Sequence, residues 1–210
     1  MKKVVSISVD LFGTLIDVDD SFEPATEIRK ALQESNISVP EDWSEAYREI
    51  HVPVDDGEEL SIVDHVHAAL GSREVDATRT VVETAVQSAF TRDIETRQGA
   101  PSVLETLSGR ESVGICSNCA VPDLVDRTIR ESALDRELLD AVVTSVGCGW
   151  RKPDPRIFEK TASELGCSVE ELVHVGDDPH ADGGIEKIGG RAVLLTEHDL
   201  TDVPALLEDR

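Results

Sequence analysis

Basic residues are scarce in this chain, and their scarcity excludes whole classes of partner. Of 210 residues, 20 are Lys or Arg and 43 are Asp or Glu, so the formal net charge is −23. Nucleic acids and anionic membrane surfaces are bound through basic patches, and we expect neither as a partner. The acids are spread along the whole chain, and their mutual repulsion needs salt to screen it. We interpret the excess as that of a halophilic protein, with an ordinary acidic mesophile protein as the alternative.

Long apolar runs and cysteine-rich segments are also missing. No run approaches the roughly 20 residues of a membrane span, and the first run, residues 4–9, is interrupted by two serines. It predicts a first strand rather than a signal peptide, and so a cytoplasmic protein. Four cysteines are too few for a disulfide scaffold. Cys116 and Cys119 have a C-x-x-C spacing, but we expect them to be buried apolar residues.

Two patterns of secondary structure divide the chain. Apolar runs alternate with helical spacing at its start and from residue 99 onward, which predicts a Rossmann-like parallel sheet covered by helices on both faces. Between these parts, residues 16–98 show helical spacing only. The predicted organisation is an α/β core of residues 1–15 and 99–210 with an all-helical insertion of residues 16–98. Strands are expected at 3–10, 112–116, 140–144, 171–175 and 191–195, and helices at 24–36, 41–51, 59–71, 74–91, 101–108, 122–131, 155–165, 181–188 and from 202.

Asp10 stands at the end of the first apolar run and is followed by a Gly13-Thr14 turn. This places a carboxylate at the carboxyl edge of the sheet, where open α/β sheets hold their ligands. Such a carboxylate acts as a nucleophile or holds a metal ion. An ordinary strand-to-loop Asp is the alternative for this residue alone.

Three further segments follow apolar runs in the same way: residues 114–118, residues 151–155 and residues 173–178 with Asp182. Together with residues 10–15, they make the chain resemble the haloacid dehalogenase superfamily of hydrolases. The resemblance implies a helical cap, here residues 16–98, and a Mg²⁺-dependent phosphatase acting on a small-molecule phosphate ester. With the acidic composition it also suggests a haloarchaeal source. It says nothing of the oligomeric state.

The resemblance also implies a role for each motif residue. Asp10 would be the nucleophile that forms an aspartyl-phosphate, and it would hold Mg²⁺ together with Asp177 and the backbone carbonyl of Phe12. Lys152 would serve the nucleophile and the phosphate as a point charge. The hydroxyl of Ser117 and the backbone N–H of Asn118 would bind the phosphate. Supporting roles fall to Thr14, Asp178 and Asp182, and for Asp178 a solvated acidic loop is an equal alternative.

Phe12 departs from the pattern, because phosphatases of this superfamily carry a second Asp at that position to protonate the leaving group. General acid–base help is worth roughly 10²- to 10⁴-fold. Either the substrate has a good leaving group, such as an acyl or aryl phosphate, or a cap residue takes over, with His51, His65 and His67 as candidates. A third reading is a haloacid dehalogenase, which has an aromatic residue there and needs neither acid nor metal.

The acidic residues after the fourth apolar run help to choose between the phosphatase and the dehalogenase. Asp177, Asp178 and Asp182 would repel Asp10 without a cation, which favours the Mg²⁺-dependent phosphatase. A non-catalytic binding protein on the same fold stays open, although it would have no reason to keep all four of Asp10, Ser117, Lys152 and Asp177.

Overall fold

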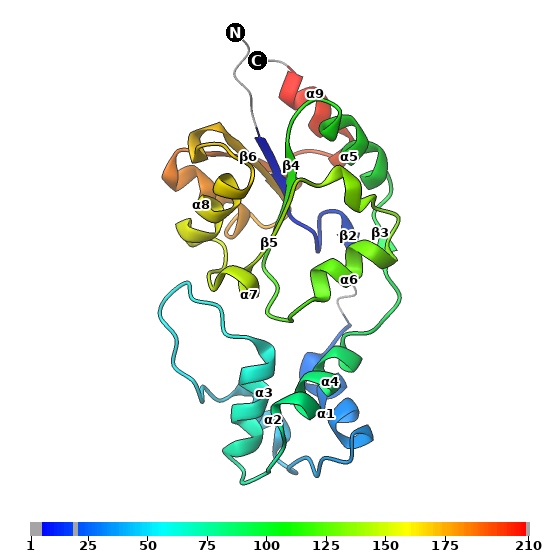
Figure 1. Cartoon of the computed structure of the whole chain (residues 1–210), viewed down its shortest axis with the longest axis vertical. Coiled ribbons are helices and arrows are strands. Elements are labelled where there is room, and N and C mark those ends of the chain that lie inside the picture. Colours follow the sequence, from blue (N-terminus) through cyan, green and yellow to red (C-terminus); the bar gives the residue numbers. More distant parts are fainter. Residues whose placement is uncertain (1–5, 19–20, 209–210) are drawn as a thin grey trace.

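A five-stranded parallel sheet forms the centre of the larger part of the molecule (Figure 1). The computed structural model describes residues 6–18 and 21–208, so residues 3–5 of the expected first strand lie outside the described chain. The strand order is β5-β4-β1-β6-β7, which puts the first strand in the middle, and this confirms the predicted Rossmann-like sheet. The strands are β1 (Ser6–Val9), β4 (Val113–Ser117), β5 (Ala141–Thr144), β6 (Leu172–Gly176) and β7 (Arg191–Leu194).

Helices cover both faces of this sheet, and each face has its own apolar core. Ile7, Val9 and Val175 point to the face covered by α5 (Ala100–Ser108), α6 (Leu124–Glu131) and α9 (Val203–Glu208). Cys116, Val143 and Leu172 point to the other face, covered by α8 (Pro155–Glu164) and the 3-10 helix η3 (Asp182–Ile188). Strands buried on both faces are typical of parallel sheets.

Short elements account for most differences from the sequence prediction. The helix expected at 181–188 is a 3-10 helix, and Gly183 and Gly184 near its start lower the propensity for an α-helix. Gly184 packs against Pro153, because a Cβ there would lie 2.5 Å from the proline ring. The sequence did not predict four short elements: α7 (Ser145–Cys148), η1 (Arg136–Leu138), η2 (Val169–Glu171) and η4 (Leu200–Asp202).

Four helices form the segment inserted after the first strand, as expected: α1 (Pro24–Glu34), α2 (Trp43–Arg48), α3 (Ile62–Gly71) and α4 (Arg79–Ala89). The prediction of no strand between 16 and 98 was wrong. Two short strands, β2 (Ile16–Asp17) and β3 (Glu95–Thr96), pair antiparallel where the chain enters and leaves this segment. Two residues are too few to show an alternating pattern. In the described chain, no helix is long and apolar enough to cross a membrane.

The loop between α2 and α3 returns from the helical segment to the core (Figure 1). The backbone N–H of Glu59 donates to Gly149 at 2.9 Å, and Arg151 donates to Gly57 at 2.9 Å. The hydroxyl of Ser145 donates to the Glu59 carboxylate at 2.7 Å. These bonds explain why α3 begins at Ile62 instead of residue 59, and they fix the backbone just before Lys152.

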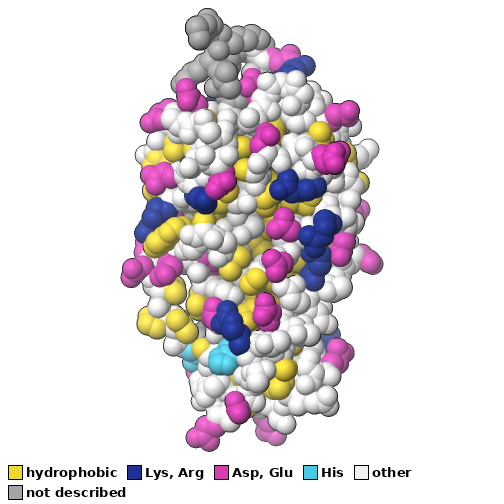
Figure 2. Space-filling view, in the orientation of Figure 1, with side chains coloured by type: hydrophobic (Ala, Val, Ile, Leu, Met, Phe, Trp, Pro, Cys, Tyr) yellow, Lys and Arg dark blue, Asp and Glu magenta, His cyan; other side chains and the backbone are white. Residues whose placement is uncertain are grey.

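Acidic side chains are scattered over both parts of the molecule on the face that Figure 2 shows. The distribution agrees with a charge of −23 spread along the sequence.

Candidate active site

Asp10 follows the last residue of the central strand, and its backbone N–H donates to the carbonyl of Val175 at 2.8 Å. This bond extends the β1–β6 pairing by one residue beyond the strand. The residue is only 9% exposed. The sheet therefore holds one carboxylate at its carboxyl edge, as the sequence predicted.

Lys152 is buried beside Asp10, with its Nζ atom 3.1 Å from Asp10 Oδ1 and 2.6 Å from Asp182 Oδ1. The side chain of Asn118 fixes its backbone, because Nδ2 donates to the Lys152 carbonyl at 3.0 Å and Oδ1 accepts from the Lys152 N–H at 2.7 Å. The segment after β4 thus positions the ammonium group next to the predicted nucleophile. Asn118 was expected to offer its backbone N–H, and its side chain has this additional role.

Asp182 is fully buried and accepts hydrogen bonds on both oxygens. Its Oδ1 accepts from Lys152 and, at 2.9 Å, from His174 Nε2, and its Oδ2 accepts from the backbone N–H of Asp178 at 2.9 Å. Gly176 makes room for it, since a Cβ there would lie 2.1 Å from the carboxyl group. Asp182 therefore joins the lysine, strand β6 and the loop after it.

His174 belongs to this network, and sequence reasoning missed it. It lies fully buried in the middle of β6, where its Nδ1 is 2.9 Å from the hydroxyl of Ser8 on β1. Ser8 and His174 are polar residues within otherwise apolar, buried strands, and this pattern is the sequence feature that could have revealed them. A buried polar group must find a partner, so two such residues on paired strands indicate a network between them.

The charges of the network shift the pKa values of its members. Burial raises the pKa of Asp10 above its ordinary value, although the Lys152 ammonium group opposes the shift. Burial alone would lower the pKa of Lys152, but the carboxylates of Asp10 and Asp182 raise it. Burial would raise the pKa of Asp182, yet the hydrogen bonds from His174 and Lys152 hold it well below its usual range. Burial and the charge of Lys152 lower the pKa of His174, so we assign it as neutral.

Asp177 lies beside Asp10 at the end of β6. Thr14 donates to its Oδ1 at 2.8 Å, and Gly13 leaves room for it, because a Cβ on Gly13 would lie 2.5 Å from the carboxylate. One oxygen each of Asp10, Asp177 and Asp182 lie within 4.8 Å of one another. Asp182 is already engaged by three donors, so Asp10 and Asp177 are the carboxylates available to a cation, and oxygen atoms suit Mg²⁺.

The buried Ser117 Oγ has no hydrogen-bond partner in the described chain, whereas the buried Asp10 Oδ1 has the Lys152 ammonium group 3.1 Å away. An orphaned group such as the hydroxyl of Ser117 is rare in proteins and points to a ligand. Ser117 ends β4 next to Asp10, as predicted, and its hydroxyl can donate to an oxyanion. The donor set thus fits a phosphate group and a divalent cation.

Asp178 and the three cap histidines, the other candidate site residues, have structural contacts instead. Asp178 accepts from the backbone N–H groups of His180 and Ala181, at 2.7 and 3.2 Å, and shapes the loop. The three cap histidines each bond a backbone carbonyl within the helical segment, at 2.7 to 3.1 Å: His51 to Ala46, His65 to Tyr47 and His67 to Ala77. The structure brings none of the three histidines into the cavity beside the site.

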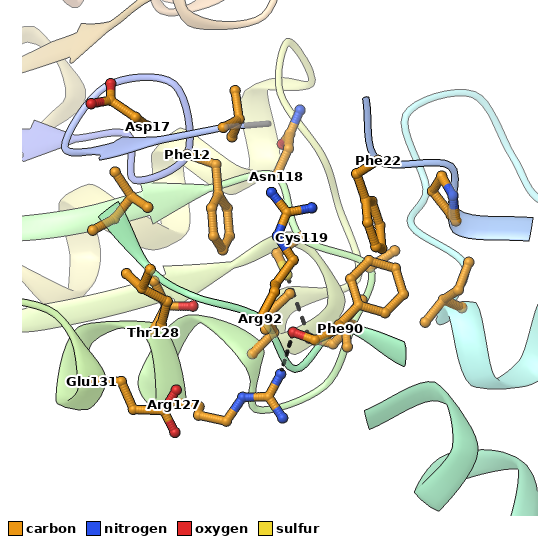
Figure 3. Close-up of a pocket in the computed structure, with 18 of the residues that line it drawn as sticks. Phe12, Asp17, Phe22, Phe90, Arg92, Asn118, Cys119, Arg127, Thr128 and Glu131 are labelled. Carbon is orange, nitrogen blue, oxygen red and sulfur yellow. Dashed lines mark hydrogen bonds between the residues drawn. The ribbon is translucent and has the colours of Figure 1, made fainter. Parts of the chain in front are cut away.

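This cavity, of about 410 Å³, lies between the helical segment and the core (Figure 3). Phe12 and Asn118 line it on the side of the site, and Phe22, Phe90 and Arg92 line it on the side of the helical segment. The size is that of an ordinary small-molecule pocket. Phe12, which the sequence marked as a departure, faces this space.

Comparisons with known proteins agree with the fold and the motifs. Two glyceraldehyde 3-phosphate phosphatases are similar in sequence. The one from Methanothermobacter thermautotrophicus is 30% identical over 49% of this chain and 46% of its own length, so the match spans about half of that relative. The one from Methanopyrus kandleri is 27% identical over 79% of this chain and 75% of its own length. None of this bears on the expected high-salt source, which stays a prediction.

Among solved structures, a 2-haloacid dehalogenase from Pseudomonas syringae pv. Tomato DC3000 superposes with a TM-score of 0.69 at 18% identity, covering 98% of each chain. At this identity the likeness shows the shared fold. The model of the haloacid dehalogenase-like hydrolase family matches residues 6–184. The chain therefore belongs to the haloacid dehalogenase-like hydrolases.

Proposed function

We propose that this protein is a Mg²⁺-dependent phosphatase that hydrolyses a small-molecule phosphate ester through Asp10. The observation that carries the proposal is the proximity of the Asp10 and Asp177 carboxylates at the sheet edge. Two carboxylates held this close repel each other unless a cation lies between them. The glyceraldehyde 3-phosphate phosphatases among its relatives support the same reaction class.

The charges of the site agree with a dication. Lys152 and Asp182 form a buried ion pair and neutralise each other. His174 is neutral, which leaves the negative charges of Asp10 and Asp177. Mg²⁺ would balance these two charges and would polarise the phosphoryl group for attack. Asp10, Asp177 and the carbonyl of Phe12 would hold it.

Each residue of the site has a separate role in the proposed reaction. A carboxylate oxygen of Asp10 attacks phosphorus and forms an Asp–O–P bond while the bond from phosphorus to the ester oxygen breaks. Lys152 keeps Asp10 ionised despite its burial, since the ammonium group lies 3.1 Å away. The hydroxyl of Ser117 and the N–H of Asn118 bind phosphoryl oxygens. Water then cleaves the aspartyl-phosphate, releases inorganic phosphate and restores Asp10.

A dehalogenase is the second candidate, and one observation favours it. Phe12, two residues after Asp10, lines the cavity with an apolar ring, and the cavity surface is mostly apolar, as a carbon–halogen substrate would need. The pair of Asp10 and Asp177 weighs against it, because displacement of halide from carbon has no use for a cation. A non-catalytic role is weakened by the orphaned hydroxyl of Ser117.

The test is hydrolysis of a generic aryl phosphate in molar KCl, with Mg²⁺ or with EDTA, by the wild type and Asp10→Asn. We expect phosphate release that requires both Mg²⁺ and Asp10. Release of chloride from 2-chloropropionate without metal, and no phosphate release, would establish the dehalogenase instead. No turnover of either substrate would indicate a binding protein.

A further inference from the structure

The cavity concentrates the few aromatic residues of this chain. Three of the four phenylalanines, Phe12, Phe22 and Phe90, line it together with the single tyrosine, Tyr47. All four are partly exposed, and Phe22 meets Phe90 edge to face with ring centroids 5.1 Å apart. Aromatic walls bind flat apolar groups through stacked and edge-to-face contacts. A ligand of this cavity therefore has a flat apolar body.

Among the residues that the structure describes, no carboxyl group that lines the cavity is buried. The lining carboxylates, Asp17, Asp93 and Glu131, are all solvent-exposed, and Asp17 is paired with Arg97 at 3.0 Å. The thiol of Cys119 donates to the Val121 carbonyl, and burial raises its pKa to about 11.

An ester oxygen that leaves unprotonated must be a weak base. An alkoxide is a strong base, so an alkyl phosphate depends on a general acid worth about 10²- to 10⁴-fold in rate. A phenol has a pKa of about 10, as the tyrosine side chain does, and its oxygen leaves far more readily. Phe12 at the position of the second Asp, the lack of a buried carboxyl group among the described lining residues and the aromatic walls thus favour the same kind of ester.

Of the two arginines that line the cavity in the described chain, one is available to a substrate. Arg127 is occupied, because its guanidinium group donates to the carbonyls of Phe90 and Gln87, at 2.8 and 3.2 Å. Arg92 lies 4.6 Å over the ring of Phe22 and forms no ion pair with any residue that the structure describes. Figure 3 shows its guanidinium group directed toward Asn118. A guanidinium group stacked on an aromatic ring keeps its N–H edge free for a carboxylate.

We propose that the substrate is an aromatic phosphate ester whose ring occupies this cavity and carries an anionic substituent that Arg92 binds. This inference rests on the proposed phosphatase function and narrows it. Asp10 attacks phosphorus, the bond from phosphorus to the phenolic oxygen breaks, and the oxygen departs as phenoxide with the electron pair. The phenoxide takes a proton from water after it has left, and water hydrolyses the aspartyl-phosphate.

The first experiment compares phenyl phosphate with benzyl phosphate, a similar apolar ester whose leaving group is an alkoxide. We expect kcat/KM for phenyl phosphate to be at least about 100-fold higher. Phe12→Asp places a carboxyl group on the wall and should narrow this gap, whereas Phe12→Leu should preserve it. Equal rates for both esters in the wild type would refute the requirement for a good leaving group.

The second experiment tests Arg92 by binding, so that it does not depend on turnover. Binding of 4-carboxyphenylphosphonate and phenylphosphonate to the Mg²⁺-loaded protein is measured by calorimetry. We expect the carboxylated compound to bind about tenfold more tightly, and Arg92→Gln to abolish this preference. Arg97→Gln, which changes an arginine outside the cavity lining, should retain it.

The outcomes separate the inference from the function on which it rests. If the protein prefers 4-carboxyphenylphosphonate but hydrolyses no ester, the phosphatase function is contradicted and the inferred ligand class is supported. Hydrolysis without a preference would support the phosphatase and overturn the assignment of Arg92. If Arg92→Gln weakens the binding of both phosphonates equally, Arg92 binds the phosphoryl group. This result would also overturn the assignment of Arg92 to the anionic substituent.

Discussion

The buried ion pair of Lys152 and Asp182 makes a specific prediction for Asp182→Asn. The carboxylate accepts hydrogen bonds from Lys152, His174 and the backbone of Asp178. An amide has one oxygen, so its NH₂ group must face at least one donor, and the Lys152 charge loses its closest partner. Breaking a buried pair from one side costs about 3–5 kcal/mol. We expect a loss of stability in that range.

The assay is urea unfolding followed by circular dichroism in molar KCl with EDTA, so that no bound metal contributes. With an m-value of about 3 kcal/mol/M, the expected loss lowers the urea midpoint by about 1–1.7 M. The control is Glu164→Gln, because Glu164 and Lys160 form an exposed i,i+4 pair. Such pairs contribute about 0.3–0.5 kcal/mol. A midpoint for Asp182→Asn as close to wild type as the control's would refute the reasoning.

The same pair gives the pH dependence a definite sign. Its partners hold the pKa of Asp182 below the value of about 3.9 that an unfolded Asp has. The stabilisation from its ionised form is therefore complete above that unfolded value and is lost as pH falls toward the folded pKa. We expect the difference between wild type and Asp182→Asn to stay constant from about pH 5 to 8 and to shrink below about pH 4. A difference that grows in acid would contradict this.

Four further predictions follow from single features. Gly13→Ala places a Cβ 2.5 Å from Asp177 at a φ of 84°, and should weaken Mg²⁺ binding measured by calorimetry at least about tenfold. Arg127→Ala removes the donor to the Phe90 carbonyl and one of the two side-chain donors to the Gln87 carbonyl, and should cost about 1–3 kcal/mol in urea unfolding. Cys116 is fully buried with a pKa raised to about 12, and Cys119 is buried too, so a thiol reagent at pH 8 should modify at most two of the four thiols before unfolding. The net charge of −23 predicts a melting temperature that rises steadily from low salt to molar KCl, and a flat response would contradict the halophilic interpretation.

The sheet and the motif residues could be predicted because their signals are local. Asp10 follows an apolar run at the predicted carboxyl edge of the sheet, and the resemblance of the four motifs to the haloacid dehalogenase superfamily implied that Ser117 and Asp177 lie at the same edge. The antiparallel pair of Ile16–Asp17 and Glu95–Thr96 was not foreseen, since it depends on two chain passages that are far apart in sequence. The role of His174 depends on Ser8, on another strand, and on Asp182 in the loop that follows.

The cavity could not be predicted from the sequence, because it also depends on residues that are far apart in the chain. Phe12, Phe22 and Phe90 come from three separate stretches, and none of them shows by its neighbours that it faces a shared space. The cap histidines were expected as substitutes for a missing acid, but each satisfies its ring nitrogen on a nearby carbonyl. The carbonyls that His65 and His67 contact lie 18 and 10 residues away along the chain, so only the fold shows these contacts.

The candidate site consists of a buried polar network and a partly exposed cavity, and the two differ in how much substitution they tolerate. The network of Ser8, His174, Asp182, Lys152 and Asp10 is buried, and its links bind β1, β6 and the segment before α8 into one unit. Buried polar networks tolerate little change, because each unpaired group costs about 1–3 kcal/mol. The cavity walls are mostly apolar surface with partly exposed side chains, which accept substitution with less cost. If the protein is the proposed phosphatase, we therefore expect substitutions in the network to change the reaction at Asp10, and substitutions of Phe12 and the residues facing it to change which ester is hydrolysed.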